Sequence, residues 1–181
     1  MSIQAGSNKL GPDNATLRVK TGRQGAAAKV GHDLVIDVTS WEATLEVGED
    51  PEESSLELSA DPRSLQVREG TGGVQPLSDE DRGDIERTIA DEVLKGEAIE
   101  FRSTAVETSD GGRRLSASGE LRMAGSSHPV DFELGVTPEG RLSGGATLRQ
   151  TDWGIKPYSA LFGALKVKDE VEIEFSTDAR S

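Results

Sequence analysis

Two histidines are the side chains of this sequence best suited to acid–base or metal chemistry at neutral pH. His32 stands between Gly31 and Asp33, and His128 precedes Pro129 far along the chain. Consecutive residues of a strand point to opposite faces, so His32 and Asp33 would not cooperate as a catalytic pair in a strand. We interpret His32 as a structural or surface residue and His128 as part of a turn, and we predict no catalytic residue.

Other signatures of catalysis, metal binding or phosphate binding are missing from the sequence. The chain has no cysteine, which excludes thiolate metal sites and a cysteine nucleophile. Residues 42–57 hold seven carboxylates, but not in the spacing of a calcium-binding loop, and we expect them to be exposed. No Gly-x-Ser-x-Gly motif occurs, and residues 70–73 lack the lysine that follows a phosphate-binding loop. We therefore predict a protein that is not an enzyme and has no metal site or cofactor.

Length and charge limit the classes of partner. The chain has 181 residues, close to one domain, with 20 basic and 33 acidic side chains and a net charge of −13. That charge repels nucleic-acid phosphates and anionic lipid head groups through the summed field. No stretch approaches the about 20 apolar residues of a spanning helix, so the protein is not membrane-embedded. Residues 1–15 show no secretory signal pattern; we interpret them as a flexible tail and expect a soluble, cytoplasmic protein.

Alternation of apolar and polar residues dominates the chain from Leu17 onward, which is typical of antiparallel strands with one buried face. The alternation changes parity near Thr39, and this change predicts a bulge or a sharp bend. Pro62 cannot donate to a ladder and predicts a strand end. Turn signals such as residues 110–112 and 124–129 separate the segments. We predict about eight strands in a single domain that spans residues 16–178.

Residues 78–95 break this rhythm and predict one inserted helix. Ser78 is a good N-cap, acidic residues follow it, and Ile85, Ile89 and Val93 recur at a spacing of four. Gly96 is a natural stop. We expect a mostly β fold, a barrel or a sandwich, with this helix across one opening.

The interior of such a barrel is either filled by side chains or wide enough for one small ligand. Several positions that the alternation assigns to the inner face are small, and they are Ala43, Ser103, Ala117, Gly119, Gly144 and Ala146. Small residues could leave an apolar cavity, or they could let the sheets approach more closely. Residues 152–165 leave a similar choice, since their aromatic side chains suit either a flap over a pocket or ordinary core under a loop.

One run of residues resembles a known family. The sequence GELRMAGSSHPVDF at residues 119–132 resembles the strand, turn and strand signature of the YceI-like family. Residues 99–104, 149–155 and 167–173 are similar to the flanking segments of that family, in the same order. The helix after Leu77 also falls where the family has one. The resemblance covers roughly residues 16–177.

The resemblance implies an antiparallel lipocalin-like barrel of eight strands, with the helix near an opening. It also implies an elongated apolar pocket for a polyisoprenoid chain or its quinone derivative, and a homodimer. His32 lies in a segment, residues 31–34, where the resemblance places a histidine at the pocket mouth, so contact with a ligand head group is the alternative to its structural role.

We therefore expect non-enzymatic binding, transport or sequestration of a long isoprenoid or quinone-type lipid in the barrel interior. The alternative is a stress-response or interaction module with a filled barrel and no lipid ligand. The inward-facing residues that we expect to bind the ligand are Leu34, Ile36, Trp41, Leu45, Leu58, Phe101, Leu121, Met123, Phe132, Leu134, Leu148, Trp153, Phe162, Ile173 and Phe175.

Overall fold

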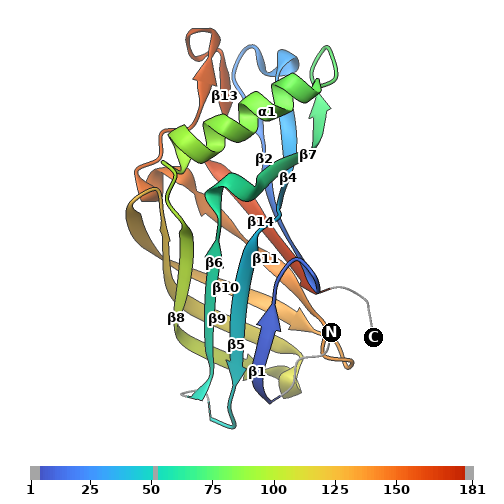
Figure 1. The fold of residues 1–181 in the computed structure, drawn as a ribbon, viewed down its shortest axis with the longest axis vertical. Helices are drawn as coiled ribbons and strands as arrows, with labels where there is room; N and C mark the ends of the chain where they lie inside the picture. Colours follow the sequence, from blue (N-terminus) through green and yellow to red (C-terminus); the bar gives the residue numbers. More distant parts are fainter. Residues whose placement is uncertain (1–4, 51–52, 178–181) are drawn as a thin grey trace.

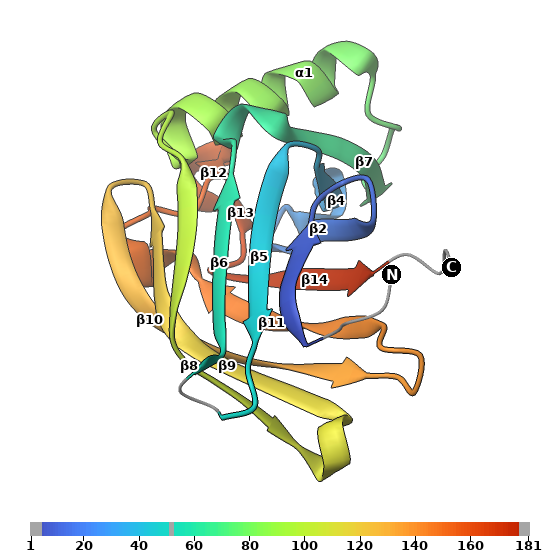
Figure 2. The ribbon, with the colours of Figure 1, turned by 60° about the horizontal axis from the view of Figure 1, so that its bottom comes forward.

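The computed structural model describes residues 5–50 and 53–177. Within them, a curled antiparallel sheet dominates the fold, and one helical segment lies across one of its ends (Figures 1 and 2). The strands of this sheet are β1 (Gly6–Leu10), β2 (Ala15–Thr21), β4 (His32–Val38), β5 (Trp41–Val47), β6 (Ser55–Ala60), β7 (Leu65–Gly72), β8 (Ile99–Ser109), β9 (Arg114–Met123), β10 (Ser126–Val136), β11 (Leu142–Arg149) and β14 (Glu170–Thr177). Their order is β1-β5-β6-β8-β9-β10-β11-β14-β2-β4-β7, which makes β1 and β7 the edge strands.

The expected fold class, mostly antiparallel β with one helix, is confirmed, but the expected closed barrel of eight strands is not, because the described edge strands β1 and β7 do not pair with each other. In the described part of the chain the curled sheet has eleven strands. Bends divide some segments: two residues separate β4 from β5, at the parity change near Thr39. The short 3-10 helix η3 (Pro62–Ser64) separates β6 from β7, at the predicted strand end. The bend after β4 lets Val38 and Trp41 both be buried, although they are an odd number of positions apart.

β1 lies in the segment that the sequence places in a flexible tail. It pairs with β5 from Gly6 opposite Val47 to Leu10 opposite Ala43. Asn8 and Leu10 are buried. The side-chain Nδ2 of Asn8 also donates to the Leu45 carbonyl oxygen at 3.3 Å. Residues 6–10 therefore belong to the sheet, and the first four residues of the expected tail lie outside the described part.

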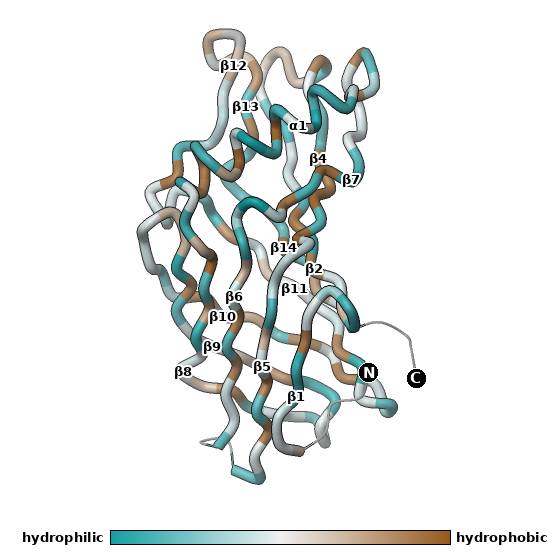
Figure 3. Tube along the Cα trace, viewed as in Figure 1, coloured by the Kyte–Doolittle hydropathy of each residue, from teal (hydrophilic) through white to brown (hydrophobic). Residues whose placement is uncertain are grey.

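The inner face of the curled sheet carries the core. Apolar and polar residues alternate along most strands (Figure 3), as the sequence predicts for strands with one buried face. The side chains of Ile36, Leu45 and Leu115 are almost fully buried. The rings of Phe101 and Phe132 lie 5.4 Å apart between their centroids, on β8 and β10. The curled sheet thus gathers its apolar side chains on the concave face.

The predicted helix is confirmed as α1 (Asp79–Thr88), which continues as the π-helical turn η4 (Ile89–Val93). The Ser78 side chain accepts from the Asp81 N–H, and the Asp81 carboxylate accepts from the Ser78 N–H in a capping box. Gly96 follows with a φ of +67°, which a glycine adopts without strain. Both helix signals in the sequence therefore act where they were expected.

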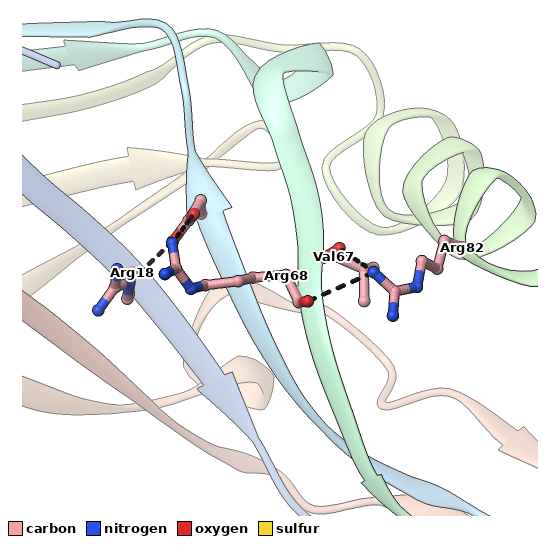
Figure 4. Close-up of polar contacts among 5 residues, drawn as sticks. Arg18, Val67, Arg68 and Arg82 are labelled. Atoms are coloured by element: carbon pink, nitrogen blue, oxygen red, sulfur yellow. Dashed lines mark hydrogen bonds and ion pairs between the residues drawn. The ribbon is translucent and has the colours of Figure 1, made fainter. Parts of the chain in front are cut away.

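Side chains of α1 bind the free edge of β7. The Val67 N–H donates to Glu86 Oε1 at 3.0 Å. Arg82 Nη1 donates to the carbonyl oxygens of Val67 and Arg68 at 3.4 and 3.3 Å (Figure 4). An unpaired strand edge is a site for aggregation, and covering it with a helix removes that hazard. These contacts therefore hold α1 over the end of the sheet and protect β7.

Asp37 joins three neighbouring strands on the outer side of this region. Its carboxylate lies 2.8 Å from Arg18 Nε on β2 and 3.1 Å from Arg68 Nη1 on β7 (Figure 4). Burial raises the pKa of Asp37, but hydrogen bonds from the two guanidinium groups outweigh burial and lower this pKa overall. The carboxylate thus stays charged and links β2, β4 and β7.

A second, small sheet stands beside the same end as α1. It contains β3 (Arg23–Gln24), β12 (Ser159–Ala160) and β13 (Leu165–Val167), in the order β12-β13-β3. The 3-10 helix η1 (Ala28–Val30) lies next to it along the chain. In the described ranges 5–50 and 53–177, no helix is long and apolar enough to cross a membrane.

Candidate functional site

A cavity of about 810 Å³ lies between the concave face of the sheet and α1. Inward side chains from β2, β4, β5, β6, β8, β9, β10, β11 and β14 form its wall. Leu, Ile, Val and Phe side chains predominate among the lining residues. A site of this volume and character falls in the range that suits a small apolar molecule.

Most of the residues predicted as ligand contacts line this cavity. They share the inward parity that the alternation assigns to them. They are Leu34, Ile36, Trp41, Leu45, Leu58, Phe101, Leu121, Met123, Phe132, Leu134, Leu148, Ile173 and Phe175, and His32 lines the cavity as well.

The small inward residues have two different roles. Ala43 and Ala146 line the cavity, as an under-filled interior requires. At Gly119, by contrast, an added Cβ would lie 2.3 Å from the Arg102 carbonyl oxygen, so this glycine marks a close approach of β9 to β8. The structure therefore shows the cavity, while Gly119 serves the pairing of two neighbouring strands in one sheet and not a closer approach of two sheets.

Trp153 lies outside the lining, although it was predicted as a contact. It ends the 3-10 helix η6 (Gln150–Trp153) and is only 2% exposed. Its indole Nε1 donates to the Leu121 carbonyl oxygen at 2.7 Å. Leu121 itself lines the cavity, so Trp153 anchors the backbone of a wall strand.

Phe162 also lies outside the lining, because it sits at the tip of the hairpin formed by β12 and β13. Its side chain is fully exposed, and its φ of +54° is uncommon for a residue other than glycine. Tyr158, just before β12, does line the cavity while 54% of it stays exposed. The segment expected to be either a flap or core is therefore divided: Trp153 is core, and the hairpin borders the cavity.

The cavity roof comes from the helical segment, which the predicted contact residues did not include. Ile85, Ile89 and Val93 line the cavity at the spacing of four that predicts the helix, together with Leu77 and Leu94. The amphipathic pattern could have identified them, because the apolar face of a helix over an opening must point inward.

Polar side chains gather at one end of the cavity, where α1 and the small sheet meet. Arg23, Asp81, Asp84 and Lys166 line this end. Arg23 comes from β3 and Lys166 from β13, so only the pairing of these distant segments brings them to the cavity. Nothing in the local sequence indicates this grouping.

His32 is the first residue of β4, and its ring contacts the backbone of the segment that leads from β7 to α1. Nε2 lies 2.8 Å from the Gln75 carbonyl oxygen. An added Cβ on Gly73, whose φ is +72°, would lie 2.4 Å from the same Nε2, so the backbone passes directly over the ring. Asp33 instead accepts from the Arg23 N–H at 3.0 Å. His32 and Asp33 do not form a pair, as the sequence predicts.

The negative charge of Asp81 is stabilised near this end of the cavity. Hydrogen bonding from the backbone and the side chain of Ser78 holds the pKa of Asp81 below its ordinary value. The cavity lining therefore includes a carboxylate that stays charged at neutral pH.

The predicted position of His128 is wrong. The turn is only two residues long, Ala124 and Gly125, both with positive φ, and His128 already lies in β10. Its Nδ1 lies 2.9 Å from the Pro129 carbonyl oxygen, and its ring lies 5.2 Å from that of Trp153. Pro129 is tolerated because this part of β10 pairs with β9 alone. Among the described residues no group of three or more His, Asp or Glu could hold a metal ion.

A curled antiparallel sheet around an apolar cavity, roofed by a helix, defines a class of β proteins that can enclose a small apolar molecule. Residues 12–179 match the family model of the YceI-like domain. The chain belongs to the YceI-like family, and the resemblance seen in the sequence is confirmed. No curated protein sequence matches the chain.

Several solved structures have folds similar to this chain. BcnA from Burkholderia cenocepacia is 14% identical, with a TM-score of 0.64, and the match covers 90% of this chain and 94% of BcnA. The YCEI protein of Campylobacter jejuni is 10% identical, with a TM-score of 0.56, and the match covers 80% of this chain and 85% of that protein. A mutant CJ YCEI protein with a monobromobimane guest is equally similar, also with a TM-score of 0.56. At these identities, the likeness concerns the fold.

Proposed function

We propose that the protein binds one long apolar molecule of polyisoprenoid or isoprenoid-quinone type in its cavity, and carries or sequesters it without chemical change. The observation that carries this proposal is the cavity of about 810 Å³ whose wall is built from apolar side chains of nearly every strand. The ligand class comes from the resemblance to the YceI-like family.

Burial of apolar surface supplies the binding free energy. Each Å² of apolar surface removed from water contributes about 25 cal/mol, so a chain that buries several hundred Å² gains roughly 10 kcal/mol before ordering costs. This gross gain exceeds the about 8 kcal/mol that corresponds to micromolar binding, and the ordering costs reduce it. A cavity of this size favours this function over the interaction module with a filled interior.

The homodimer and the cytoplasmic location stay predictions.

A non-catalytic role agrees with the environment of His32. This side chain is the one best suited to acid–base chemistry, yet its Nε2 already contacts the Gln75 carbonyl oxygen and its carboxylate neighbour Asp33 binds Arg23. The Gln75 contact gives His32 a structural role at the polar end of the cavity, and contact with a ligand head group stays the alternative.

The test is titration with a polyprenol and with a fluorescent apolar probe. We expect saturation at about one molecule per chain, and loss of binding in Phe132→Asp, which places a charge on the cavity wall. Phe162→Asp is the matched control, since Phe162 is outside the lining and fully exposed, and it should bind normally. Circular dichroism checks that both variants fold.

If Phe132→Asp fails to fold, Ile85→Asp places the same charge in the roof, on a helix outside the sheet. Normal binding by a folded Phe132→Asp or Ile85→Asp protein would contradict the assignment of the cavity. Refusal of all apolar probes by the unaltered protein would contradict the proposed function.

A further inference from the structure

Residues 22–31 and 154–168 form one projection beside the cavity, which we name the basic lobe. β13 pairs with β3, and the Ala27 N–H donates to the Ala164 carbonyl oxygen at 2.8 Å. Gly25 has a φ of +104°, and an added Cβ there would lie 2.3 Å from the same oxygen, so the two segments touch through their backbones. The lobe stands at the end of the molecule where α1 lies (Figure 1).

The lobe has a charge opposite to that of the whole chain. Its cations are Arg23, Lys29, Lys156, Lys166 and Lys168, and it contains no Asp or Glu, although the chain carries a net charge of −13. The four lysine side chains are exposed, and none has an ion-pair partner in the described part of the chain. Their charges are therefore available to an external anion.

The lobe also exposes large apolar side chains. Val30 is 43% exposed, Tyr158 54%, and Phe162 fully. Phe162 is held at the hairpin tip with a φ of +54°, a conformation that an aromatic residue rarely adopts. An aromatic tip flanked by lysines is the combination found where proteins insert into the interface of a membrane.

The apolar surface of the lobe continues into the cavity. Val30 and Tyr158 are exposed on the lobe and also line the cavity, and so does Lys166 on β13. A molecule that enters from the lobe thus meets the apolar side chains of Val30 and Tyr158 beside the charged groups of Arg23 and Lys166. An apolar phase in contact with the lobe would therefore border the cavity lining.

We propose that the basic lobe docks on the surface of an anionic lipid bilayer, with Phe162 in the interface, and that the ligand passes between bilayer and cavity over Val30 and Tyr158. This inference rests on the proposed function. The net charge of the chain opposes approach, but at physiological salt charges act only over a Debye length of about 8 Å. The lysines of the lobe then attract the bilayer at the hairpin tip, and acidic residues at the opposite end of the molecule are screened. The acidic first turn of α1, which lies at the same end as the lobe, opposes this attraction.

The test uses a tryptophan at the tip. Trp41 and Trp153 are only 6% and 2% exposed. Phe162→Trp therefore adds the one tryptophan of the described residues whose fluorescence responds strongly to contact with water. With vesicles of phosphatidylglycerol and phosphatidylcholine, we expect a blue shift of its emission and protection from acrylamide. Unchanged emission and quenching in the presence of these vesicles would overturn the proposal.

Co-sedimentation with the same vesicles measures the contribution of each group. Phe162→Ser should weaken binding, and Lys29→Gln with Lys156→Gln should weaken it by roughly fivefold for each lysine. Val74→Ser is the matched control, because Val74 is 77% exposed but lies outside the lobe and the cavity lining. Equal binding by the lysine variant, or equal binding to vesicles of phosphatidylcholine alone, would overturn an anionic bilayer as the partner.

Titration of the same variants with the apolar probe in solution, without vesicles, separates this inference from the proposed function. Lobe variants that bind the probe normally but sediment less with vesicles support docking. If the unaltered chain binds the probe normally but never sediments with vesicles, docking on a bilayer is overturned and the proposed function stands. A partner protein would then be the acceptor of the ligand to test. Failure to bind the probe would instead overturn the cavity function.

Discussion

The indole Nε1 of Trp153 donates a hydrogen bond of 2.7 Å to the backbone carbonyl oxygen of Leu121. The second tryptophan, Trp41, is 6% exposed and meets Phe175 edge-on at 6.0 Å, but its Nε1 has no hydrogen-bond partner among the described residues. Burial costs more free energy for the Trp41 N–H than for the Trp153 N–H, because only the Trp153 N–H regains a hydrogen bond in the folded chain.

We expect Trp153→Phe to lower the free energy of unfolding by about 1–2 kcal/mol more than Trp41→Phe does. The first change removes a hydrogen bond, while the second removes an N–H that is buried without a partner. Urea denaturation followed by far-UV circular dichroism measures both. Equal losses, or a larger loss for Trp41→Phe, would contradict the role assigned to the Trp153 bond.

Asp37 should make the free energy of unfolding fall as the pH becomes acidic. Its pKa in the folded chain lies below the ordinary 3.8, because Arg18 and Arg68 outweigh burial. The unfolded chain therefore takes up a proton first as pH falls, so the stabilisation is present above about pH 4 and is lost as pH falls through the native pKa. We expect Asp37→Asn to lose about 1 kcal/mol at pH 7.

The same variant should lose less stability than the unaltered protein between pH 7 and pH 3, because it has no carboxyl at this position to protonate. Urea denaturation at a series of pH values checks this. Asp33→Asn is a control on the same strand, and its profile should follow that of the unaltered protein. Parallel profiles for Asp37→Asn and the unaltered protein would show that Asp37 contributes nothing to the pH dependence.

Glu86 provides a matched pair for the contact between α1 and β7. Glu86→Ala removes the acceptor of the 3.0 Å hydrogen bond from the Val67 N–H, and we expect a loss of about 1–2 kcal/mol. Glu86→Gln keeps an oxygen that can accept this bond and should lose less. Thermal unfolding measures the difference, and the two Arg82 hydrogen bonds still hold α1 on β7 in both variants. Identical behaviour of the two variants would argue against this bond.

Much of the cavity wall could be predicted from the sequence, because parity along a strand determines which face a side chain joins. Leu121 and Phe132 follow from that rule, and Ser78 and Gly96 mark the helix through local capping chemistry. β1 was missed because Gly6 and its polar neighbours resemble a loop; their strand is set by pairing with distant β5.

The remaining parts of the site depend on contacts between distant segments. Phe162 and Trp153 lie in a stretch without periodicity, so no rule assigns them a face. Arg23 and Lys166 reach the cavity only because β3 pairs with β13. Such groupings follow from tertiary packing, which overrides local patterns.

The basic lobe has a practical consequence for handling the protein. It holds four of the seven lysines of the chain, and all four are exposed. Reagents that couple lysine amines to a chip or a bead would therefore attach many molecules through the lobe, with the polar end of the cavity facing the support. Immobilisation through the opposite end would leave the same molecules accessible to apolar compounds in solution.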